Sequence, residues 1–133
     1  MVLESWAARA PASKRIYPYR LTPGSRPDLK FELDWAPMIE ALLEDQRQEI
    51  CVPEIARCVH ETLARALADL AARFDIAQVA LTGGCFQNRL LTERSCAMLR
   101  RADKSVFLNR RVPPGDGGLA LGQALWTRWT GGA

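Results

Sequence analysis

The sequence predicts an α/β fold in which a short sheet is flanked by helices. Three observations support this prediction: a long apolar stripe at helical spacing over residues 53–74, two short runs of β-forming residues, QVAL and SVFLN, and a glycine-containing loop after each run. Helix-like segments follow both loops, so the ordered part of the chain alternates between strands and helices. This alternation is typical of an α/β unit. The 133 residues suffice for one modest domain or part of a larger one.

The first 34 residues are expected to be irregular. Four prolines interrupt them, at positions 11, 18, 23 and 27, and proline breaks regular structure. The run RIYPYRL could still form an edge strand, because Pro18 can occupy a position where no ladder hydrogen bond is needed. We therefore separate an irregular N-terminal segment, residues 1–34, from an ordered region, residues 35–133.

Two helices are predicted to open the ordered region. The first covers about residues 36–48, with Asp34 as a plausible N-cap and Pro37 in the first turn. The second covers about residues 53–74, and its apolar stripe consists of Ile55, Val59, Leu63, Leu67 and Leu70. His60 falls beside this stripe and is expected to be packed rather than to bind a ligand, since the chain has no second histidine.

The remaining elements follow in order along the chain. Residues 78–81 are predicted to form a short buried strand, 90–102 a helix, 105–109 a second strand and 118–129 a final helix. The final helix is slim along one side because several of its residues are small, which predicts close packing against the sheet: Gly118, Ala120, Gly122 and Ala124.

Composition excludes several classes of protein. The net charge of +3 is too weak to indicate nucleic-acid binding, and the pairs Arg100-Arg101 and Arg110-Arg111 are also compatible with ordinary solvated surface. None of the four cysteines forms a Cys-x2-Cys pair, so a structural zinc site is not indicated. No apolar run is long enough for a membrane helix, and the first residues do not resemble a signal peptide. We expect a cytoplasmic protein with reduced thiols.

The loop TGGCFQN, after the first predicted strand, could admit a ligand. Gly83 and Gly84 have no Cβ, so a ligand can lie against their backbone, whose N–H groups favour an anion such as phosphate. Asn88 offers both a donor and an acceptor, which suits a ribose or a carbamoyl group. A plain strand-to-helix turn is the alternative. The spacing matches neither the Walker A pattern nor GxGxxG.

The loop PPGDGG, after the second predicted strand, contains the carboxylate of Asp116. Because a helix begins directly afterwards, residue chemistry favours Asp116 as a helix cap over a ligand of a divalent metal ion. Parallel strands place their carboxyl-end loops together, so the two loops are expected to form one site. Cys85 is the only cysteine in these loops, and nothing near it in sequence indicates an activated nucleophile.

Taken together, the two loops resemble one protein family. VALTGGCFQNRLLTE and NRRVPPGDGGLALGQALW, with 28 positions between Asn88 and Asp116, resemble the C-terminal end of HypF, the carbamoyltransferase family of [NiFe]-hydrogenase maturation. The same module is similar to the tRNA threonylcarbamoyladenosine synthase subunit TsaD and to antibiotic carbamoyltransferases, but FQNRLL and PPGDGGLALGQ favour the hydrogenase branch. The resemblance implies that residues 35–133 form the C-terminal, TsaD-like lobe of an actin- and Hsp70-like (ASKHA) fold.

The resemblance also implies roles for individual residues. Gly83 and Gly84 would line an adenine nucleotide, Asn88 would contact the nucleotide or carbamoyl adenylate, Asp116 would bind a divalent metal ion, and Gly117 would lie beside that site. In the family, carbamoyl phosphate and ATP give carbamoyl adenylate. The carbamoyl group then passes to the C-terminal cysteine of the partner protein HypE.

The chain departs from the family because the other HypF domains are absent from the 133 residues. The missing parts include a first lobe whose paired histidines would complete the metal site. We therefore expect a fragment that is inactive unless another chain supplies this lobe, with an exposed face that favours self-association. Two alternatives stay open: a lobe of a tRNA threonylcarbamoyl transferase, and a non-catalytic nucleotide-binding or interaction remnant.

Overall fold

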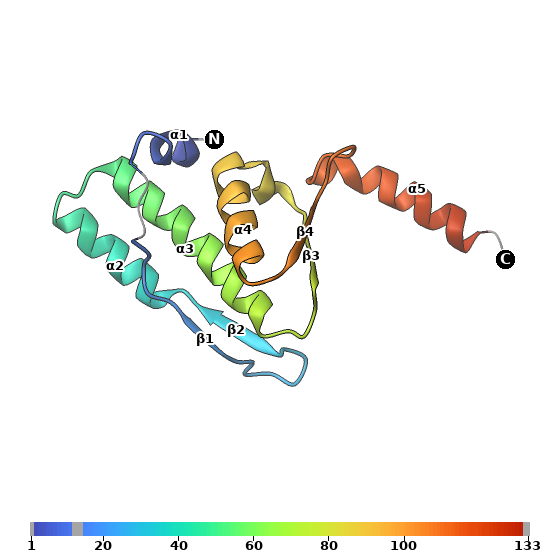
Figure 1. Ribbon diagram of the computed structural model, residues 1–133, viewed down its shortest axis with the longest axis horizontal. Helices are drawn as coiled ribbons and strands as arrows, with labels where there is room; N and C mark the ends of the chain where they lie inside the picture. Colours follow the sequence, from blue (N-terminus) through green and yellow to red (C-terminus); the bar gives the residue numbers. More distant parts are fainter. Residues whose placement is uncertain (1, 12–14, 132–133) are drawn as a thin grey trace.

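The computed structural model describes residues 2–11 and 15–131. Helices and strands alternate in the second half of the chain, as the sequence predicts (Figure 1). The elements are α1 (Val2–Ala7), β1 (Arg20–Pro23), β2 (Phe31–Asp34), α2 (Ala36–Arg47), α3 (Val52–Ala72), β3 (Gln78–Leu81), α4 (Arg89–Arg101), β4 (Ser105–Leu108) and α5 (Leu119–Thr130), with two 3-10 turns, η1 (Gly84–Gln87) and η2 (Asp116–Gly118).

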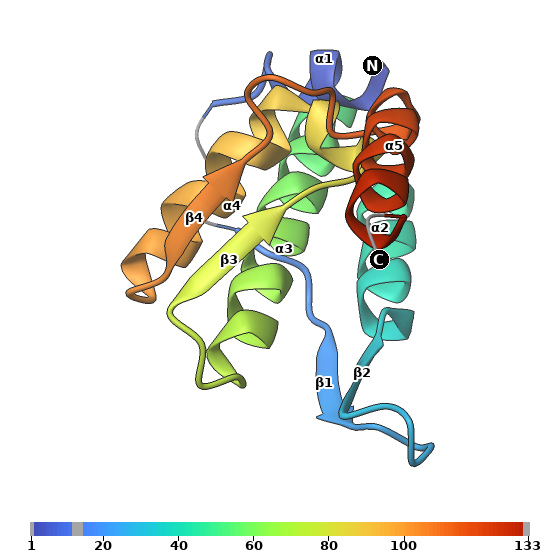
Figure 2. The same ribbon diagram turned by 90° about the vertical axis from the view of Figure 1, so that its right-hand side faces the viewer.

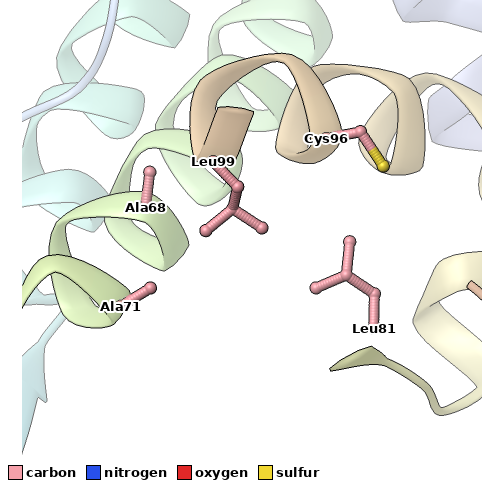
Figure 3. Close-up of a cluster of buried hydrophobic side chains, with 5 residues drawn as sticks. All are labelled: Ala68, Ala71, Leu81, Cys96 and Leu99. Carbon is pink, nitrogen blue, oxygen red and sulfur yellow. The ribbon is translucent and has the colours of Figure 1, made fainter. Parts of the chain in front are cut away.

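The long helix α3 forms the centre of the fold. Helices α1 and α4 pack against it, and the β3–β4 sheet covers the side of α4 and α3 that faces α5 in Figure 1. One buried cluster joins α3, α4 and β3, and Leu99 at its centre is fully buried (Figure 3). Its members are Ala68, Ala71, Leu81, Cys96 and Leu99. This cluster fixes the strands, and hence the loops that follow them, relative to the helices.

Strands β3 and β4 are parallel and are connected through α4 (Figure 2). Gln78 pairs with Ser105 and Leu81 pairs with Leu108, so both strands end at the same edge of the sheet. Val79 and Val106 pack against the buried cluster, whereas Phe107 is exposed on the opposite face. Helices thus cover one face of this sheet, which confirms the predicted α/β class with a short sheet flanked by helices.

The description of residues 1–34 as irregular is wrong for two parts of that segment. Residues Val2–Ala7 form α1, and β1 and β2 form an antiparallel hairpin in which Arg20 pairs with Asp34. The prolines do not prevent this, because Pro18 precedes β1 and Pro23 is its last residue. The division between residues 34 and 35 stays a prediction.

A second buried cluster fastens the segment before β1 to the helices. Tyr17 is almost fully buried with Met38, Cys58 and Val59. Its backbone N–H donates to Thr62 Oγ1 at 2.7 Å, and its hydroxyl donates to Asp45 at 2.7 Å. Contacts between side chains and helices, rather than regular structure, therefore hold this part of the chain in place.

The helix ends lie within two residues of their predicted positions, with one difference in capping. Trp35 is the N-cap of α2, while Asp34 Oδ1 accepts a hydrogen bond from the backbone N–H of Ala36 at 2.9 Å. Pro37 lies in the first turn, as predicted. Within the described part of the chain, no helix is both long and apolar enough to span a membrane.

The prediction that α5 packs closely on the sheet is wrong. None of its residues is buried, and Figure 1 shows the helix leading away from the body of the molecule. Small residues permit close packing but do not supply a partner surface, and α5 contacts chiefly the adjacent turn η2 rather than the β3–β4 sheet.

Candidate functional site

The two glycine-containing loops meet at the carboxyl ends of β3 and β4. The backbone N–H of Gly83 donates to the carbonyl of Pro114 at 2.6 Å, and the Thr82 hydroxyl donates to the same oxygen at 3.4 Å. A Cβ on Gly115 would lie 2.8 Å from Gln87 Nε2, so the loops are also in close contact there. The expectation that the loops form one site is thus met in its geometry.

The two glycines of the first loop have different roles. Gly83 has a φ of 104°, which residues with a side chain rarely adopt, so the turn itself requires glycine. Gly84 does not need this freedom, and a Cβ there would have no neighbour within 4 Å. Gly84 therefore leaves open space beside the backbone, as the ligand hypothesis requires.

Two backbone donors of this loop are available to a ligand. The N–H groups of Gly84 and Cys85 have no hydrogen-bond partner among the described residues, because the bonds of η1 begin with the N–H of Phe86. Adjacent free N–H groups in a turn favour an anionic ligand.

A pocket of about 600 Å³ lies between the loops and the first turns of α5. It is open to solvent, and both glycines of the first loop and the carboxylate-bearing residue of the second line it. Its lining residues include Thr82, Gly83, Gly84, Asn109, Asp116 and Trp126. Asn88 and Gly117 are not among the lining residues, although Gly117 lies next to Asp116 in η2.

Asp116 does not cap α5. The N-cap position belongs to Gly118 and has no side-chain cap, while Asp116 begins the preceding 3-10 turn. A Cβ on Gly118 would lie 2.6 Å from the Pro113 carbonyl oxygen, so the tight turn before α5 depends on glycine at this position. The Asp116 carboxylate is exposed and accepts no hydrogen bond from any described residue. It is thus available to a cation, and the preference for capping from sequence is not met.

Asn88 is buried and does not line the pocket. Its Oδ1 accepts a hydrogen bond from the N–H of Leu91 at 2.9 Å, which caps α4, and its Nδ2 lies 2.7 Å from His60 Nε2. His60 Nδ1 lies 2.7 Å from the Ala56 carbonyl, which can only accept, so Nδ1 carries the proton and Nε2 accepts from Asn88. The structure therefore gives Asn88 a positioning role, and its contact with a ligand stays a prediction.

A buried ion pair holds α4 to α3 near this hydrogen bond. The Glu61 carboxylate is 1% exposed and lies 3.0 Å from Arg57 and 2.8 Å from Arg94. Since Arg94 belongs to α4 and Glu61 to α3, the pair fixes the helix that Asn88 caps. The first loop is thus anchored at its far end by an ion pair between Glu61 and Arg94, which lie 33 positions apart in the sequence.

Sequence reasoning did not identify several residues that line the pocket. Thr82 and Asn109 directly follow β3 and β4, and their positions at the strand ends were an available signal. Trp126 has the helical spacing i, i+3 and i+7 with Gly122 and Leu119, which also line the pocket. This spacing was the available sequence signal for the face of α5 that lines the pocket.

Metal binding and nucleophilic catalysis are limited in the described part of the chain. No group of three histidine, cysteine, aspartate or glutamate side chains in it could hold a metal ion, so Asp116 would be one ligand of an incomplete set. Cys85 is exposed in η1, but the only histidine of the chain is buried against Asn88. No described base activates this thiol.

Comparison with known proteins gives the family. Residues 1–123 match the family model described as carbamoyltransferase, Kae1-like domain, second subdomain. The chain is 33% identical over 113 residues to the carbamoyltransferase HypF of Synechocystis sp., covering 85% of this chain and 14% of the relative. It is 38% identical over 121 residues to HypF of Rhodobacter capsulatus, covering 86% of this chain and 16% of the relative.

Solved structures agree with the sequence comparisons. A crystal structure of full-length HypF in a phosphate- and nucleotide-bound form superposes with a TM-score of 0.84 at 29% identity, over 98% of this chain and 17% of the HypF chain. HypF of T. kodakarensis gives a TM-score of 0.73 at 28% identity, over 99% of this chain and 17% of the other. The chain therefore spans about one sixth of these relatives. It belongs to the HypF carbamoyltransferase family and corresponds to the second subdomain of the Kae1-like domain.

Proposed function

We propose that this chain forms one side of the nucleotide site of a carbamoyltransferase that serves [NiFe]-hydrogenase maturation. The observation that carries the proposal is the pocket itself. There, the open backbone of Gly84 and the unpartnered carboxylate of Asp116 lie at the carboxyl ends of two parallel strands. Ligands of open α/β sheets bind at such strand ends. The chain's membership in the HypF family supports the choice of reaction.

The proposed ligand is ATP and, after reaction with carbamoyl phosphate, carbamoyl adenylate. The free N–H groups of Gly84 and Cys85 would offset phosphate charge, and the absence of a side chain at Gly84 would let the ligand approach the backbone. A nucleotide bound to the full-length HypF relative is consistent with a nucleotide site in this family.

Asp116 would contribute one ligand to a divalent metal ion. Its carboxylate suits such an ion because it is exposed, lines the pocket and has no competing partner among the described residues. When bound, the ion would neutralise phosphate charge and polarise the carbonyl of the carbamoyl group. The remaining ligands would come from residues outside these 133.

The transfer step would have a thiolate as its acceptor. The proposed acceptor is the C-terminal cysteine of a HypE-like partner, whose sulfur would attack the carbamoyl carbon. The C–O bond to the adenylate would break and AMP would leave. The part of this chain in that step would be to hold and orient the adenylate, since the described residues include no base near Cys85 or Asp116. The other half of the site would come from the first lobe.

Calorimetric titration of ATP with Mg²⁺ into the purified chain tests the half-site. Gly84→Val places a side chain in open space, and it causes no backbone strain because the φ of Gly84 is not positive. Asp116→Asn removes a charge that pairs with no described residue. Both variants should therefore fold normally and lose the weak binding expected of the parent chain. Asp75→Asn is the matched control, because Asp75 is also exposed and unpaired among the described residues but lies before β3.

Two outcomes would contradict the proposed site. Binding that survives both pocket substitutions would place the nucleotide elsewhere, and no binding by a folded chain would exclude a preformed half-site.

The reaction is tested separately by adding the chain to a relative's HypF from which the corresponding subdomain has been removed. Restored AMP formation from ATP, carbamoyl phosphate and a HypE-like acceptor protein is expected, and it should require Asp116.

A further inference from the structure

A second groove runs along the outer edge of β4. Its volume is about 640 Å³, and it is lined by one residue of α4 and by consecutive residues of β4 and the following loop: Arg100, Val106, Phe107, Leu108, Asn109, Arg110, Arg111 and Val112. Val106 and Phe107 point to opposite faces of the strand because side chains alternate along it. A groove that both residues line, and that no residue of β3 lines, therefore follows the edge of the strand.

This edge is unpaired in the described part of the molecule. β4 forms backbone hydrogen bonds with β3 on one side only, and no described segment bonds to its other side. The outward N–H and C=O groups of such a strand can accept another extended chain. Phe107 is 54% exposed and Leu108 is 39% exposed, so apolar side chains lie beside the free backbone groups.

The charge of the groove is positive and uncompensated. Arg100, Arg110 and Arg111 form no ion pair with any described residue, whereas Arg57 and Arg94 share the buried Glu61. The groove has no acidic lining residue. Arginines that flank an edge strand can serve merely to prevent its aggregation, but here they border a groove with a free strand and exposed apolar side chains.

We propose that the outer edge of β4 binds an acidic, extended segment of a partner protein as an added strand. The backbone of β4 would supply the hydrogen bonds, Phe107 and Leu108 would contact alternate apolar side chains, and the three arginines would pair with carboxylates. The proposal goes beyond the nucleotide site and does not depend on it, because the residues that carry the charge and the free edge do not line that site.

The test measures binding of a fluorescent six-residue peptide of alternating glutamate and valine to the whole chain by anisotropy. We expect saturable binding that weakens about tenfold in the triple variant Arg100→Gln, Arg110→Gln, Arg111→Gln. The matched control is Arg20→Gln, Arg26→Gln, Arg47→Gln, which removes the same charge from exposed positions on other elements and should bind the peptide like the parent chain. Circular dichroism verifies that both variants fold.

Besides failure of the acidic peptide to bind, three results would each overturn the proposal. The first is equal loss in the control variant, which would indicate attraction by net charge alone. The second is undiminished binding of the same peptide after N-methylation of every amide, since an added strand requires its N–H groups. The third is equally tight binding of a single-stranded oligonucleotide of matched charge, with the same dependence on the three arginines.

Discussion

Helices α3 and α5 are both rich in apolar residues, yet the protein uses them in opposite ways. Helix α3 buries residues along most of its length, including Ala56, Cys58 and Ala64, against α1, α4 and the segment around Tyr17. Helix α5 buries none, and Trp129 is 85% exposed. An apolar pattern at helical spacing therefore predicts a helix with one face suited to burial. It does not show whether the surface that buries this face belongs to the same 133 residues.

The pocket lies where these two regions meet. Its first loop is anchored to the body through Asn88 and His60, whereas its second loop leads into α5 and is held mainly by the hydrogen bond from Gly83 to Pro114. One wall is therefore rigidly supported and the other rests on a few contacts. Substitutions in each region test this difference.

The largest effect is expected in the body. Leu99→Ala should lower the free energy of unfolding by about 2–5 kcal/mol, because the fully buried side chain packs between α3, α4 and β3 and leaves a cavity. Urea denaturation measures this loss. Leu125→Ala is the control on α5, with an expected change of about 0.5 kcal/mol or less because Leu125 is 57% exposed. Equal effects at the two positions would show that α5 is packed as tightly as the body of the molecule.

A smaller effect is expected where the first loop is anchored. Asn88→Ala should destabilise the chain by about 2 kcal/mol, since it removes the cap of α4 and leaves the buried Nε2 of His60 without its donor. Asn109→Ala, in the second loop, is the exposed comparison and should change stability little. Thermal unfolding would measure both. An unchanged melting temperature for Asn88→Ala would mean that the Asn88–His60 bond does not anchor the loop.

This prediction also affects how ligand experiments are read. Loss of nucleotide binding in Asn88→Ala could follow from displacement of the loop, so it would not show direct contact with the ligand. Gly84→Val and Asp116→Asn are cleaner probes because neither residue forms a side-chain bond within the described structure.

Stability should depend on pH through the buried bonds of the body. Hydrogen bonding from Arg15 lowers the pKa of Asp45, and the Tyr17 hydroxyl adds to this effect. A lowered pKa in the folded state means that the stabilisation is complete above the ordinary aspartate value of about 4 and is lost as the pH falls through the folded value. Asp45→Asn should cost about 1–2 kcal/mol at neutral pH and flatten the acid side of the profile.

The alkaline side of the same profile has the opposite sign. Burial, followed by hydrogen bonds to Asp45 and Asp69, raises the pKa of Tyr17 and Tyr19. The stabilisation is therefore complete below the ordinary tyrosine value of about 10 and declines above it. Urea midpoints between pH 3 and pH 11 test both limbs. If the acid limb of the profile keeps its slope in Asp45→Asn, other carboxylates cause the loss of stability at low pH.

Much of the fold was predictable because local patterns decide it. The bounds of β3 match the prediction, since its apolar residues 79–81 lie between Gln78 and Thr82, and the stripe of Ile55 and Val59 identified α3. The prolines led to the wrong description of residues 1–34, because sequence does not show that Pro23 falls at a strand end. The family was identified from the two loop motifs together. The residues of these motifs determine the geometry of the candidate site more than they determine the fold.

The least predictable parts are those that depend on distant residues. The partner of Asn88 is His60, 28 positions earlier, and no local pattern links a helix cap to a histidine on another helix. Asp116 is of a residue type that favours capping but lies two residues before the N-cap of α5. In both cases sequence chemistry identified a polar residue that matters, and only the three-dimensional arrangement showed which group it serves.

The smallest effect on stability is expected at the end of α5, and it tests this helix most directly. Trp129→Ala should leave the free energy of unfolding within about 0.5 kcal/mol of the parent value, because the ring contributes little buried area.

The substitution Trp129→Ala should instead change the self-association of the chain. Leu121, Leu125 and Trp126 are also exposed on this helix, and such apolar surface favours contact with another chain. Sedimentation velocity should therefore show less self-association for Trp129→Ala than for the parent chain. A parent chain that is monomeric at every accessible concentration would show that α5 does not drive self-association, and loss of stability in the variant would show that α5 packs on the body in solution.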